Sequence, residues 1–438
     1  MEKGIRHARM ARTYPLSLLF SGLGKAGRAN YYGYSDIQNA LMKMTQSVIS
    51  CWRLLWVPLL LLGALASPLQ AEERSLPTNR PDASGPSPRV EGKPAGKAVI
   101  VVEAEAVDEK DLAAARARVE KANSVAPNVR LQIYLDEKRF GPGFIDGKPG
   151  KFTTKAVHSY NRSMGRDPDA WEVLREEANR MLGETYAVAV VPDFAADWVN
   201  PDLPLEYADQ AEEERMSYRS YLEFMAERYH TSESFLIELN GAAVANGIAP
   251  RKALLVPNVS PFLIEDLKEG RSHREDLTLS ARTVVIDTIG RNLFIYEKGA
   301  SPGAPGAAVV VAEKNENFEP QKLIAMFPIT PGRLEQTHHG EWAIANCLEL
   351  PSWYYDKQLL DTGVRNKDRS KVLQIPPGPN LPVGILWSGL TKSGIGIHGT
   401  ASPRTIGRSL SAGCIRLANW DAVRFPTLIR PGAKVIVR

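Results

Sequence analysis

The sequence is poor in cysteine, with only Cys51, Cys347 and Cys414 among 438 residues. Three thiols this far apart cannot form the disulfide framework of a small secreted scaffold. The chain also lacks the CxxC and HExxH patterns of zinc sites and the complete GxGxxG pattern of a dinucleotide loop. His338 and His339 are adjacent, so on a strand they would point to opposite sides and could not share a metal. We therefore expect no metal and no cofactor.

An excess of one charge is missing too. The chain has 54 basic and 50 acidic side chains, and residues 1–71 hold eight of the basic and two of the acidic ones. The remainder, with 46 basic and 48 acidic side chains, is almost neutral. Nucleic-acid binding needs a basic patch. The sequence shows no such patch, so we expect no nucleic-acid partner.

Long hydrophobic runs are absent as well. The apolar stretch Leu54–Ala66 has thirteen residues and is interrupted by Pro58, whereas a membrane span needs about 20. Arg53 precedes the stretch and small residues follow it, which is the layout of a secretory signal peptide. We expect export to the periplasm or cell envelope, with no stable membrane anchor after the signal is removed. A leader of ordinary length would begin at Met42 or Met44.

The remaining sequence divides into several predicted units. After the amino-terminal extension and signal peptide at 1–71, residues 72–98 are rich in proline, glycine, serine and charge, which predicts a flexible linker. The rest exceeds one domain of roughly 100–200 residues. We expect an α-rich module at 99–205, a second module at 218–262 and a mainly β, sandwich-like domain at 282–438.

Local patterns predict the elements of these units. Helical periodicity marks Asp111–Asn123 and Asp169–Leu182 in the first module and two short segments in the second, Tyr221–Tyr229 and Ser232–Leu239. Short runs separated by turn residues predict strands. They are Val99–Glu103, Tyr186–Val191, Val284–Asp287, Leu293–Tyr296, Val309–Ala312, Leu323–Phe327, Trp342–Ala345, Ile385–Trp387, Gly394–His398 and Lys434–Val437.

The chemistry of the chain is concentrated near its carboxy terminus. His398 lies sixteen positions before Cys414, which stands in the run SLSAGCIRLAN. A free cysteine is often a buried small hydrophobe, but Gly413 allows close approach of a substrate to the backbone, and Ser411 and Arg416 bring polar groups. A thiol with a pKa of about 8.5 becomes a nucleophile when a base such as an imidazole lies beside it. We expect Cys414 and His398 to form such a pair.

These residues resemble the signature of the L,D-transpeptidase catalytic domain of YkuD type. The resemblance covers residues 282–438 and includes the opening hairpin, the loop from Pro376 to Gly384, His-Gly-Thr at 398–400 and Ser-x-Gly-Cys-Ile-Arg at 411–416. Ala412 replaces a histidine of the strict signature, and Thr337–Gly340 lacks the usual turn proline. Cys347 is unmatched: it is either a buried free thiol, which we favour, or a partner of Cys414 in a disulfide.

The resemblance implies a cysteine acyltransferase that acts on peptidoglycan stem peptides. His398 would take the proton of Cys414, and the sulfur would attack the carbonyl after the diamino acid of a tetrapeptide stem. The terminal D-alanine would depart, and a thioester between the stem and Cys414 would form. An amine acceptor would react with this thioester in a transfer reaction. Water would instead hydrolyse it, as in an L,D-carboxypeptidase or endopeptidase. A non-catalytic peptidoglycan-binding protein is the other alternative. The acceptor could be a second stem, a lipoprotein side chain or a free D-amino acid.

Further site residues are expected around this pair. Backbone N–H groups near Gly413 and Cys414 are candidates for an oxyanion hole, and Ser411 and Gly399 lie beside them. Arg416 would either bind a substrate carboxylate or hold the loop. The group that orients His398 is a backbone carbonyl or a side chain.

Three neighbouring aromatic residues, Trp353, Tyr354 and Tyr355, stand in the irregular insertion Leu350–Asn380. Long loops are often lids. These aromatics would therefore wall the substrate cleft or simply pack beneath the loop.

Two weaker resemblances lie upstream. Residues from Leu131 to Tyr160 are similar to a small helical peptidoglycan-binding domain, with a turn at Asp146–Gly147 and Thr153 as the cap of the next helix; a generic helical scaffold is the alternative. Residues 218–262 resemble a degenerate LysM unit that binds glycan, or else form a helical spacer. Together they predict wall-binding modules before the catalytic domain.

Overall fold

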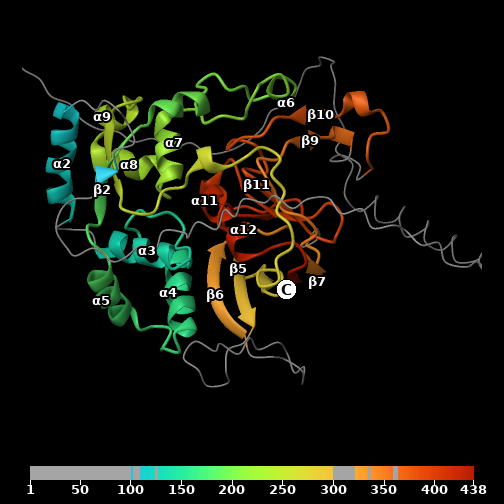
Figure 1. The fold of residues 1–438 in the computed structure, drawn as a ribbon, viewed down its shortest axis with the longest axis horizontal. Coiled ribbons are helices and arrows are strands. Elements are labelled where there is room, and N and C mark those ends of the chain that lie inside the picture. Colours follow the sequence, from blue (N-terminus) through green and yellow to red (C-terminus); the bar gives the residue numbers. More distant parts are fainter. Residues whose placement is uncertain (1–99, 102–108, 124–126, 299–320, 334–336, 359–363) are drawn as a thin grey trace, which may run out of the picture. The chain divides into compact units, whose positions relative to one another are not determined.

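Helices dominate the first half of the described chain and strands the second (Figure 1). The computed structural model describes residues 100–101, 109–123, 127–298, 321–333, 337–358 and 364–438. The extension and signal peptide expected at 1–71, the linker at 72–98 and the strand expected at Val309–Ala312 lie outside these residues. Within the described ranges, no helix has both the length and the apolar character needed to cross a membrane.

The helical half begins with four helices. They are α2 (Glu109–Asn123), α3 (Pro127–Glu137), α4 (Lys151–Ser163) and α5 (Trp171–Met181). The predictions for the first and last of these are confirmed, and Asp146–Gly147 forms a turn in which Gly147 has a φ of 74°. The capping role expected of Thr153 is wrong: Gly150 is the N-cap residue of α4. Thr153 lies inside the helix, where it is buried and its hydroxyl donates to the carbonyl of Pro142.

A three-stranded sheet joins the two predicted upstream modules. It consists of β1 (Ile100–Val101), β2 (Tyr186–Val190) and β3 (Ala253–Pro257). β2 runs parallel to β1 and antiparallel to β3. Every residue of β2 and β3 is buried, which explains why both read as continuous apolar runs rather than alternating ones. The module boundaries at 99–205 and 218–262 remain predictions.

Between β2 and β3 the chain forms short helices: α6 (Tyr207–Gln210), α7 (Tyr221–Arg228), α8 (Glu233–Asn240) and α9 (Ala242–Asn246). The hydroxyl of Ser220 accepts from the N–H of Glu223 at the start of α7. Ser232 does the same for Phe235 at the start of α8. Side-chain caps of this kind satisfy N–H groups that have no partner inside the helix. The two helices predicted from the sequence are thereby confirmed.

The carboxy-terminal half contains two larger sheets. The five-stranded sheet has the order β6-β5-β4-β14-β7 and the four-stranded sheet the order β13-β12-β11-β8. The first comprises β4 (Thr283–Asp287), β5 (Asn292–Lys298), β6 (Gln321–Pro328), β7 (Gly340–Ala343) and β14 (Lys434–Val437). The second comprises β8 (Leu348–Glu349), β11 (Leu386–Gly389), β12 (Gly396–His398) and β13 (Ile415–Arg416). Two short helices, α11 (Asn419–Ala422) and α12 (Phe425–Leu428), precede β14. The predicted β-rich carboxy-terminal domain is confirmed.

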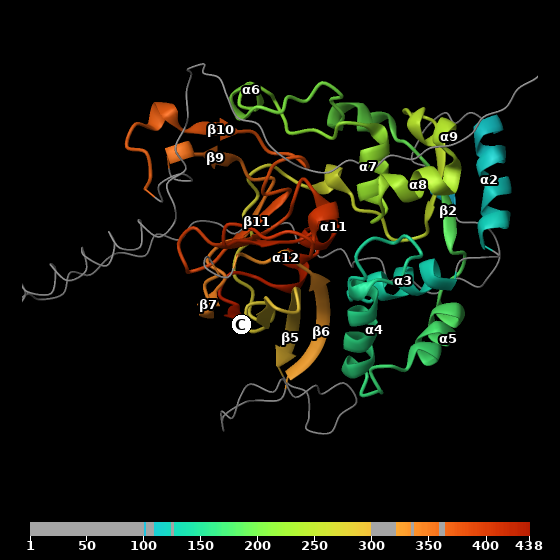
Figure 2. The same cartoon turned by 180° about the vertical axis from the view of Figure 1, so that it is seen from behind.

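The five-stranded sheet is covered on both faces. Val284 and Ile286 belong to the same hydrophobic cluster as Ile397 and Ile415 of the four-stranded sheet. Val285, which points the opposite way, joins the cluster formed by α3, α4 and α5. Figures 1 and 2 both show α4 beside β6. Because successive strand residues face opposite sides, a strand with two covered faces needs the apolar run that β4 has.

The insertion Leu350–Asn380 is more ordered than predicted. It contains β9 (Trp353–Tyr355) and β10 (Leu373–Ile375), which pair in antiparallel register with Tyr355 opposite Leu373. The sequence-based description of this segment as irregular is therefore wrong in part. The β-branched and aromatic residues of the two strands favour such a ladder.

A buried ionic cluster connects the helical half with the carboxy-terminal half. The carboxylate of Asp136, at the end of α3, lies 2.6 Å from a guanidinium nitrogen of Arg424 and 3.0 Å from Nδ1 of His230. Burial alone would raise the pKa of Asp136, but the charges of Arg424 and His230 outweigh it and hold the pKa well below its usual range. Removing one member would leave a buried charge without compensation, so this cluster ties α3 to the start of α12.

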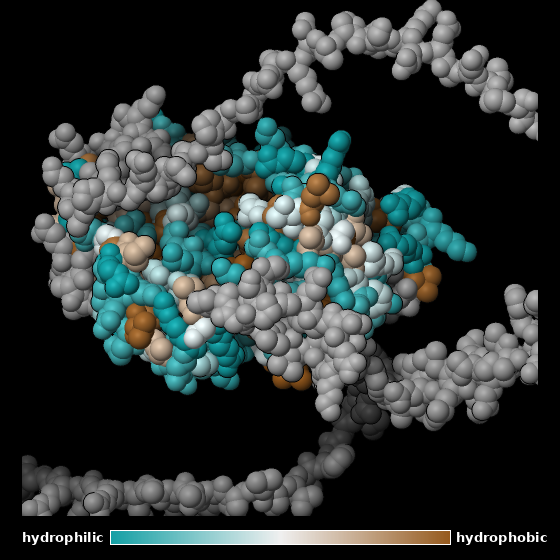
Figure 3. All heavy atoms as spheres, turned by 60° about the horizontal axis from the view of Figure 1, so that its bottom comes forward, coloured by the Kyte–Doolittle hydropathy of each residue, from teal (hydrophilic) through white to brown (hydrophobic). Residues whose placement is uncertain are grey.

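Hydrophilic residues cover most of the described surface in the view of Figure 3, and hydrophobic ones form separate small patches. The most exposed large apolar side chains are those of Leu277, Ile289 and Leu205. Isolated apolar side chains are normal on protein surfaces.

Candidate active site

Parallel pairing of β12 and β13 brings the predicted pair together. Ile397 lies opposite Ile415 and His398 opposite Arg416. Residue 414 precedes β13, so on a shared register it lies diagonally across from His398 and on the same face. The strand spacing of ~4.8 Å and the rise of ~3.3 Å per residue put their Cα atoms about 8 Å apart. The fifteen intervening residues thus fold back so that the two positions lie on one face of the paired strands.

His398 is held in a defined tautomer. Its side chain is nearly buried, with the residue 4% exposed. Nδ1 lies 2.7 Å from the carbonyl oxygen of Gly399, so Nδ1 carries the proton and donates it to that oxygen, and Nε2 keeps its lone pair. Trp387 of β11 stacks on the ring at a centroid distance of 5.6 Å. Burial lowers the pKa of His398 to about 4, and the charge of Arg416 acts in the same direction, while hydrogen bonds to the backbone of Gly399 and Val383 act against it.

Cys414 is partly exposed and free. Its sulfur lies 3.6 Å from the carbonyl oxygen of Gly394. Burial raises the pKa of the thiol, while the N–H of Gly396 and the charge of Arg416 act against that rise. Within the described part of the chain, the sulfur makes no hydrogen bond with the imidazole. Both groups are therefore neutral at rest.

Gly396 provides the space that this arrangement needs. A Cβ atom at this position would come within 2.7 Å of the indole of Trp387. Without it, the indole reaches across the face of β12 to the imidazole, and the backbone N–H of Gly396 reaches the sulfur. Gly396 thus has a steric reason, whereas Gly394 has open space around it but a φ of 79°, which favours glycine.

The turn before Cys414 is fixed by internal hydrogen bonds. Gly413 has a φ of 117°, which favours glycine, and its N–H donates to the hydroxyl of Ser411 at 3.2 Å. That hydroxyl donates to the carbonyl of Cys414. A Cβ atom on Gly332 would lie only 2.7 Å from Gly413 Cα. Gly332 is therefore needed because its segment passes so close to the turn before Cys414.

The backbone donors near the sulfur are therefore not equivalent. The N–H of Gly413 already has a partner, and Ser411 is buried within the turn. No hydrogen-bond partner for the N–H of Cys414 exists among the residues that the structure describes. Of the donors expected at this turn, the one on Cys414 is available to a ligand.

Arg416 lies on the same face as the pair. Its backbone exchanges hydrogen bonds with Thr330 at 3.0 Å in both directions. Its Nε atom is buried and makes no hydrogen bond to any described residue. The guanidinium charge lowers the pKa values of both His398 and Cys414. The backbone of Arg416 is thus fixed by hydrogen bonds, while its Nε–H donor is unused among the described residues.

Asn419 is a residue of the site that sequence reasoning missed. Its side chain is fully buried. Oδ1 accepts from the N–H of Thr400 at 3.1 Å and from that of Ile385 at 3.4 Å, and Nδ2 donates to the carbonyl of Pro379 at 3.2 Å. It thereby fixes the loop that leaves His398. Asn419 ends the run that drew attention to Cys414, but nothing in the sequence shows that its amide bridges three segments.

The three aromatic residues of the insertion occupy two environments. The rings of Trp353 and Tyr355 contact Tyr207, at centroid distances of 5.3 and 4.4 Å. Tyr354 is 54% exposed. Two of the three therefore pack against the helical half, and a role of these residues as a cleft wall remains a prediction.

Cys347 is a buried free thiol, so the interpretation favoured from the sequence holds. The hydroxyl of Ser388 donates to its sulfur at 3.3 Å. Burial raises the pKa of Cys347 to about 11. Throughout the described ranges, no cluster of three or more histidine, cysteine or acidic side chains is arranged to hold a metal ion.

Comparison with known proteins places this site in a family. Residues 306–437 match the model of the YkuD family, described as an L,D-transpeptidase catalytic domain. The chain is 24% identical over 217 residues to YkuD of Bacillus licheniformis, whose assignment as an L,D-transpeptidase is provisional; the match covers 49% of this chain and 92% of that protein. It is 27% identical over 153 residues to YqjB of Bacillus subtilis, which has the same provisional assignment, covering 33% and 77%.

Solved structures similar to this chain carry the same description. An L,D-transpeptidase from Mycobacterium smegmatis is 17% identical, with a TM-score of 0.24, and the match covers 36% of this chain and 58% of that one. L,D-transpeptidase 3 from Mycobacterium tuberculosis is 15% identical, with a TM-score of 0.24 and coverages of 43% and 75%. The carboxy-terminal part of this chain is an L,D-transpeptidase catalytic domain of the YkuD family, and an α+β region precedes it.

Proposed function

We propose that the protein is a peptidoglycan L,D-transpeptidase that works through a thioester on Cys414. The observation that carries the proposal is the placement of Cys414 and His398 on one face of two paired strands, with Nδ1 of the imidazole 2.7 Å from the carbonyl oxygen of Gly399. The family acts on peptidoglycan stem peptides, which supplies the substrate class. As an enzyme of the cell wall, the protein would act outside the cytoplasm, in agreement with the signal peptide expected from the sequence.

The first half-reaction begins from a neutral thiol and a neutral imidazole. A high thiol pKa and a low imidazole pKa both disfavour a preformed ion pair. His398 Nε2 therefore takes the proton as the sulfur attacks the carbonyl carbon that follows the diamino acid of a tetrapeptide stem. The imidazole then gives this proton to the nitrogen of the departing D-alanine. The products are a thioester and free D-alanine.

The second half-reaction repeats these steps in reverse order. An acceptor amine approaches the thioester, His398 removes a proton from it, and the nitrogen attacks the carbonyl carbon. The bond between carbon and sulfur breaks, and the proton returns to the sulfur. A new amide is formed and Cys414 is regenerated. The acceptor is a second stem, a lipoprotein side chain or a free D-amino acid.

The neighbouring groups have distinct parts in this mechanism. The backbone N–H of Cys414 would donate a hydrogen bond to the oxyanion of each tetrahedral intermediate and so stabilise it. The carbonyl of Gly399, 2.7 Å from Nδ1, would orient the imidazole and act as the third group of the site. Ser411 and Gly413 shape the turn rather than contact substrate. Arg416 has a free buried Nε with which to bind a stem carboxylate.

The decisive experiment uses purified protein and a disaccharide tetrapeptide, with products identified by mass spectrometry. Transfer predicts D-alanine release together with a cross-linked dimer. Release of D-alanine with a single shortened stem would instead support the hydrolytic alternative, an L,D-carboxypeptidase. An unchanged substrate would contradict both and favour a non-catalytic wall-binding protein. The sensitivity of the assay is checked with an added D-alanine standard.

A further inference from the structure

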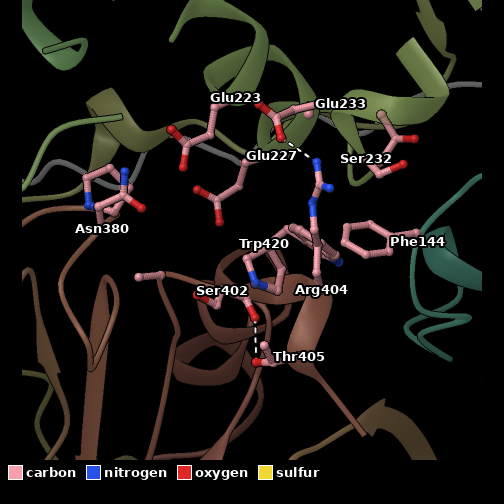
Figure 4. Close-up of a pocket in the computed structure, with 15 residues that line it drawn as sticks. Phe144, Glu223, Glu227, Ser232, Glu233, Asn380, Ser402, Arg404, Thr405 and Trp420 are labelled. Atoms are coloured by element: carbon pink, nitrogen blue, oxygen red, sulfur yellow. Dashed lines mark hydrogen bonds and ion pairs between the residues drawn. The ribbon is translucent and has the colours of Figure 1, made fainter. Parts of the chain in front are cut away.

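A cavity of about 340 Å³ lies between the start of the carboxy-terminal helices and α7 and α8 (Figure 4). Its walls come from α7, from α8 and its cap, and from the loop 401–405 that follows the His398 segment. Trp420 and Phe144 supply aromatic surface. Neither Cys414 nor His398 lines it. The cavity is thus separate from the thiol site, and half of it is built by residues that precede the matched catalytic domain.

Two carboxylates on α7 face this cavity. Glu223 and Glu227 are four residues apart and therefore on one side of the helix, and Figure 4 shows both pointing into the space above Trp420. Glu227 is 6% exposed. Burial raises its pKa to about 8, the nearby charge of Glu223 raises it further, and the groups that oppose this, Tyr218 and Asn419, are neutral.

The cavity offers these carboxylates no protein cation. Arg404 lines the cavity, but its guanidinium pairs with Glu233 at the rim. In the described part of the chain, neither Glu223 nor Glu227 belongs to a salt bridge. Glu223 is half-buried and accepts a hydrogen bond from the N–H of Arg219, whereas Glu227 is buried. A ligand cation placed between the two carboxyl groups would stabilise the ionised form of both. A primary ammonium group suits this position because it carries one charge and three hydrogen-bond donors.

A basic region borders this cavity. A neighbouring cavity of about 600 Å³ shares Phe144, Pro403, Arg404 and Trp420 with the first. Its lining includes three lysines near the start of α4 and two further arginines: Lys148, Lys151, Lys155, Arg291 and Arg408. The two adjoining cavities, here called the joined cleft, thus have an acidic end, an aromatic middle and a mainly basic end, which Asp146 and Asp421 also line. This gradient matches a flexible ligand that has an ammonium group at one end and carboxylates at the other.

We propose that this joined cleft is a second, non-covalent binding site for a peptidoglycan stem peptide. The side-chain ammonium of the diamino acid lies between Glu223 and Glu227, its aliphatic chain packs on Trp420, and the stem carboxylates point toward Lys151 and Arg408. The choice of ligand rests on the proposed function. Such a site would keep the enzyme on the wall polymer and hold one stem while Cys414 acts on another.

The test measures binding to the full chain carrying Cys414→Ser, which cannot turn the peptide over. Two soluble tetrapeptide stems are compared by calorimetry, one with a free side-chain amine and one with that amine acetylated. We expect the free amine to bind roughly ten- to hundredfold tighter, as befits a hydrogen-bonded charge. Adding Glu227→Gln should erase this difference. Adding Glu176→Gln, an exposed carboxylate on α5 outside both cavities, should leave it unchanged.

An equal preference for the free amine in the Glu227→Gln and Glu176→Gln proteins would overturn the proposal. Glu223→Gln provides a second variant should the first fail to fold, as judged by circular dichroism. D-alanine release by the unmodified chain is assayed separately. Selective binding without D-alanine release would defeat the proposed function but not the cleft, and D-alanine release without selective binding would defeat the cleft alone.

Discussion

The side chain of Asn419 tests whether the loop after His398 is positioned by one buried amide. Asn419→Ala would leave the N–H groups of Thr400 and Ile385 and the carbonyl of Pro379 without their partner. A buried polar group that loses its partner costs about 1–3 kcal/mol. The contact to Ile385, at 3.4 Å, is long and contributes least. The free energy of unfolding should therefore fall by about 3 kcal/mol.

The same substitution should slow catalysis. Asn419 does not touch the thiol, so its effect reaches the reaction through the segment of His398, Gly399 and Thr400. A displacement of about 1 Å at the reacting groups can cost about a hundredfold in rate. We expect kcat for D-alanine release to fall at least about tenfold, with a smaller change in KM. The pattern distinguishes a positioning residue from one that binds substrate.

Urea denaturation followed by circular dichroism measures the stability, and D-alanine release measures the rate. Asn246→Ala on α9, at an exposed position, is the matched control and should change the unfolding free energy by no more than about 0.5 kcal/mol. The reasoning is refuted if Asn419→Ala unfolds within about 1 kcal/mol of the unmodified protein and keeps its rate.

Four other outcomes follow from the structure. Cys414→Ser should abolish D-alanine release and the acyl-enzyme seen by intact mass, because the hydroxyl is a far weaker nucleophile; persistent turnover would exclude this sulfur. Since burial lowers the pKa of His398 to about 4, the base is already neutral in mild acid, so kcat/KM should be flat from about pH 5.5 to 7.5; an acid limb near the ordinary histidine pKa would contradict this. The Asp136 carboxylate has a lowered pKa in the folded protein, so its stabilising effect is present above its unfolded pKa and lost as pH falls through the folded one. Asp136→Asn should cost about 3 kcal/mol at pH 7 by leaving Arg424 with only the more distant carboxyl group of Asp421, at 3.8 Å, and urea unfolding should show that deficit shrink below about pH 4. Iodoacetamide at pH 8 should label Cys414 well before Cys347, whose thiol is buried with a pKa of about 11; peptide mapping decides the order.

Several elements were predictable because their signals are local. The caps Ser220 and Ser232 lie next to the helices that they start, and the apolar runs of β4 and β5 identify strands without any knowledge of their partners. The failures are equally instructive. Thr153 was expected to cap α4 because it is a good capping residue near a turn, but its hydroxyl found a buried partner in Pro142 instead. Tertiary packing overrode local preference there.

By itself the sequence predicted the chemistry that we propose for the site: a cysteine and a histidine in a glycine-rich setting, with the motifs of a known family. These depend on residue type and spacing along the chain. The tertiary structure alone decided which backbone N–H beside the sulfur stays free, that a carbonyl fixes the imidazole, and that Asn419 links three segments. It also placed Glu227 opposite Trp420 across a cavity that no sequence motif predicts. Several of these residues, such as Glu227 and Trp420, lie far apart in the sequence, and only the folded chain brings them close to each other.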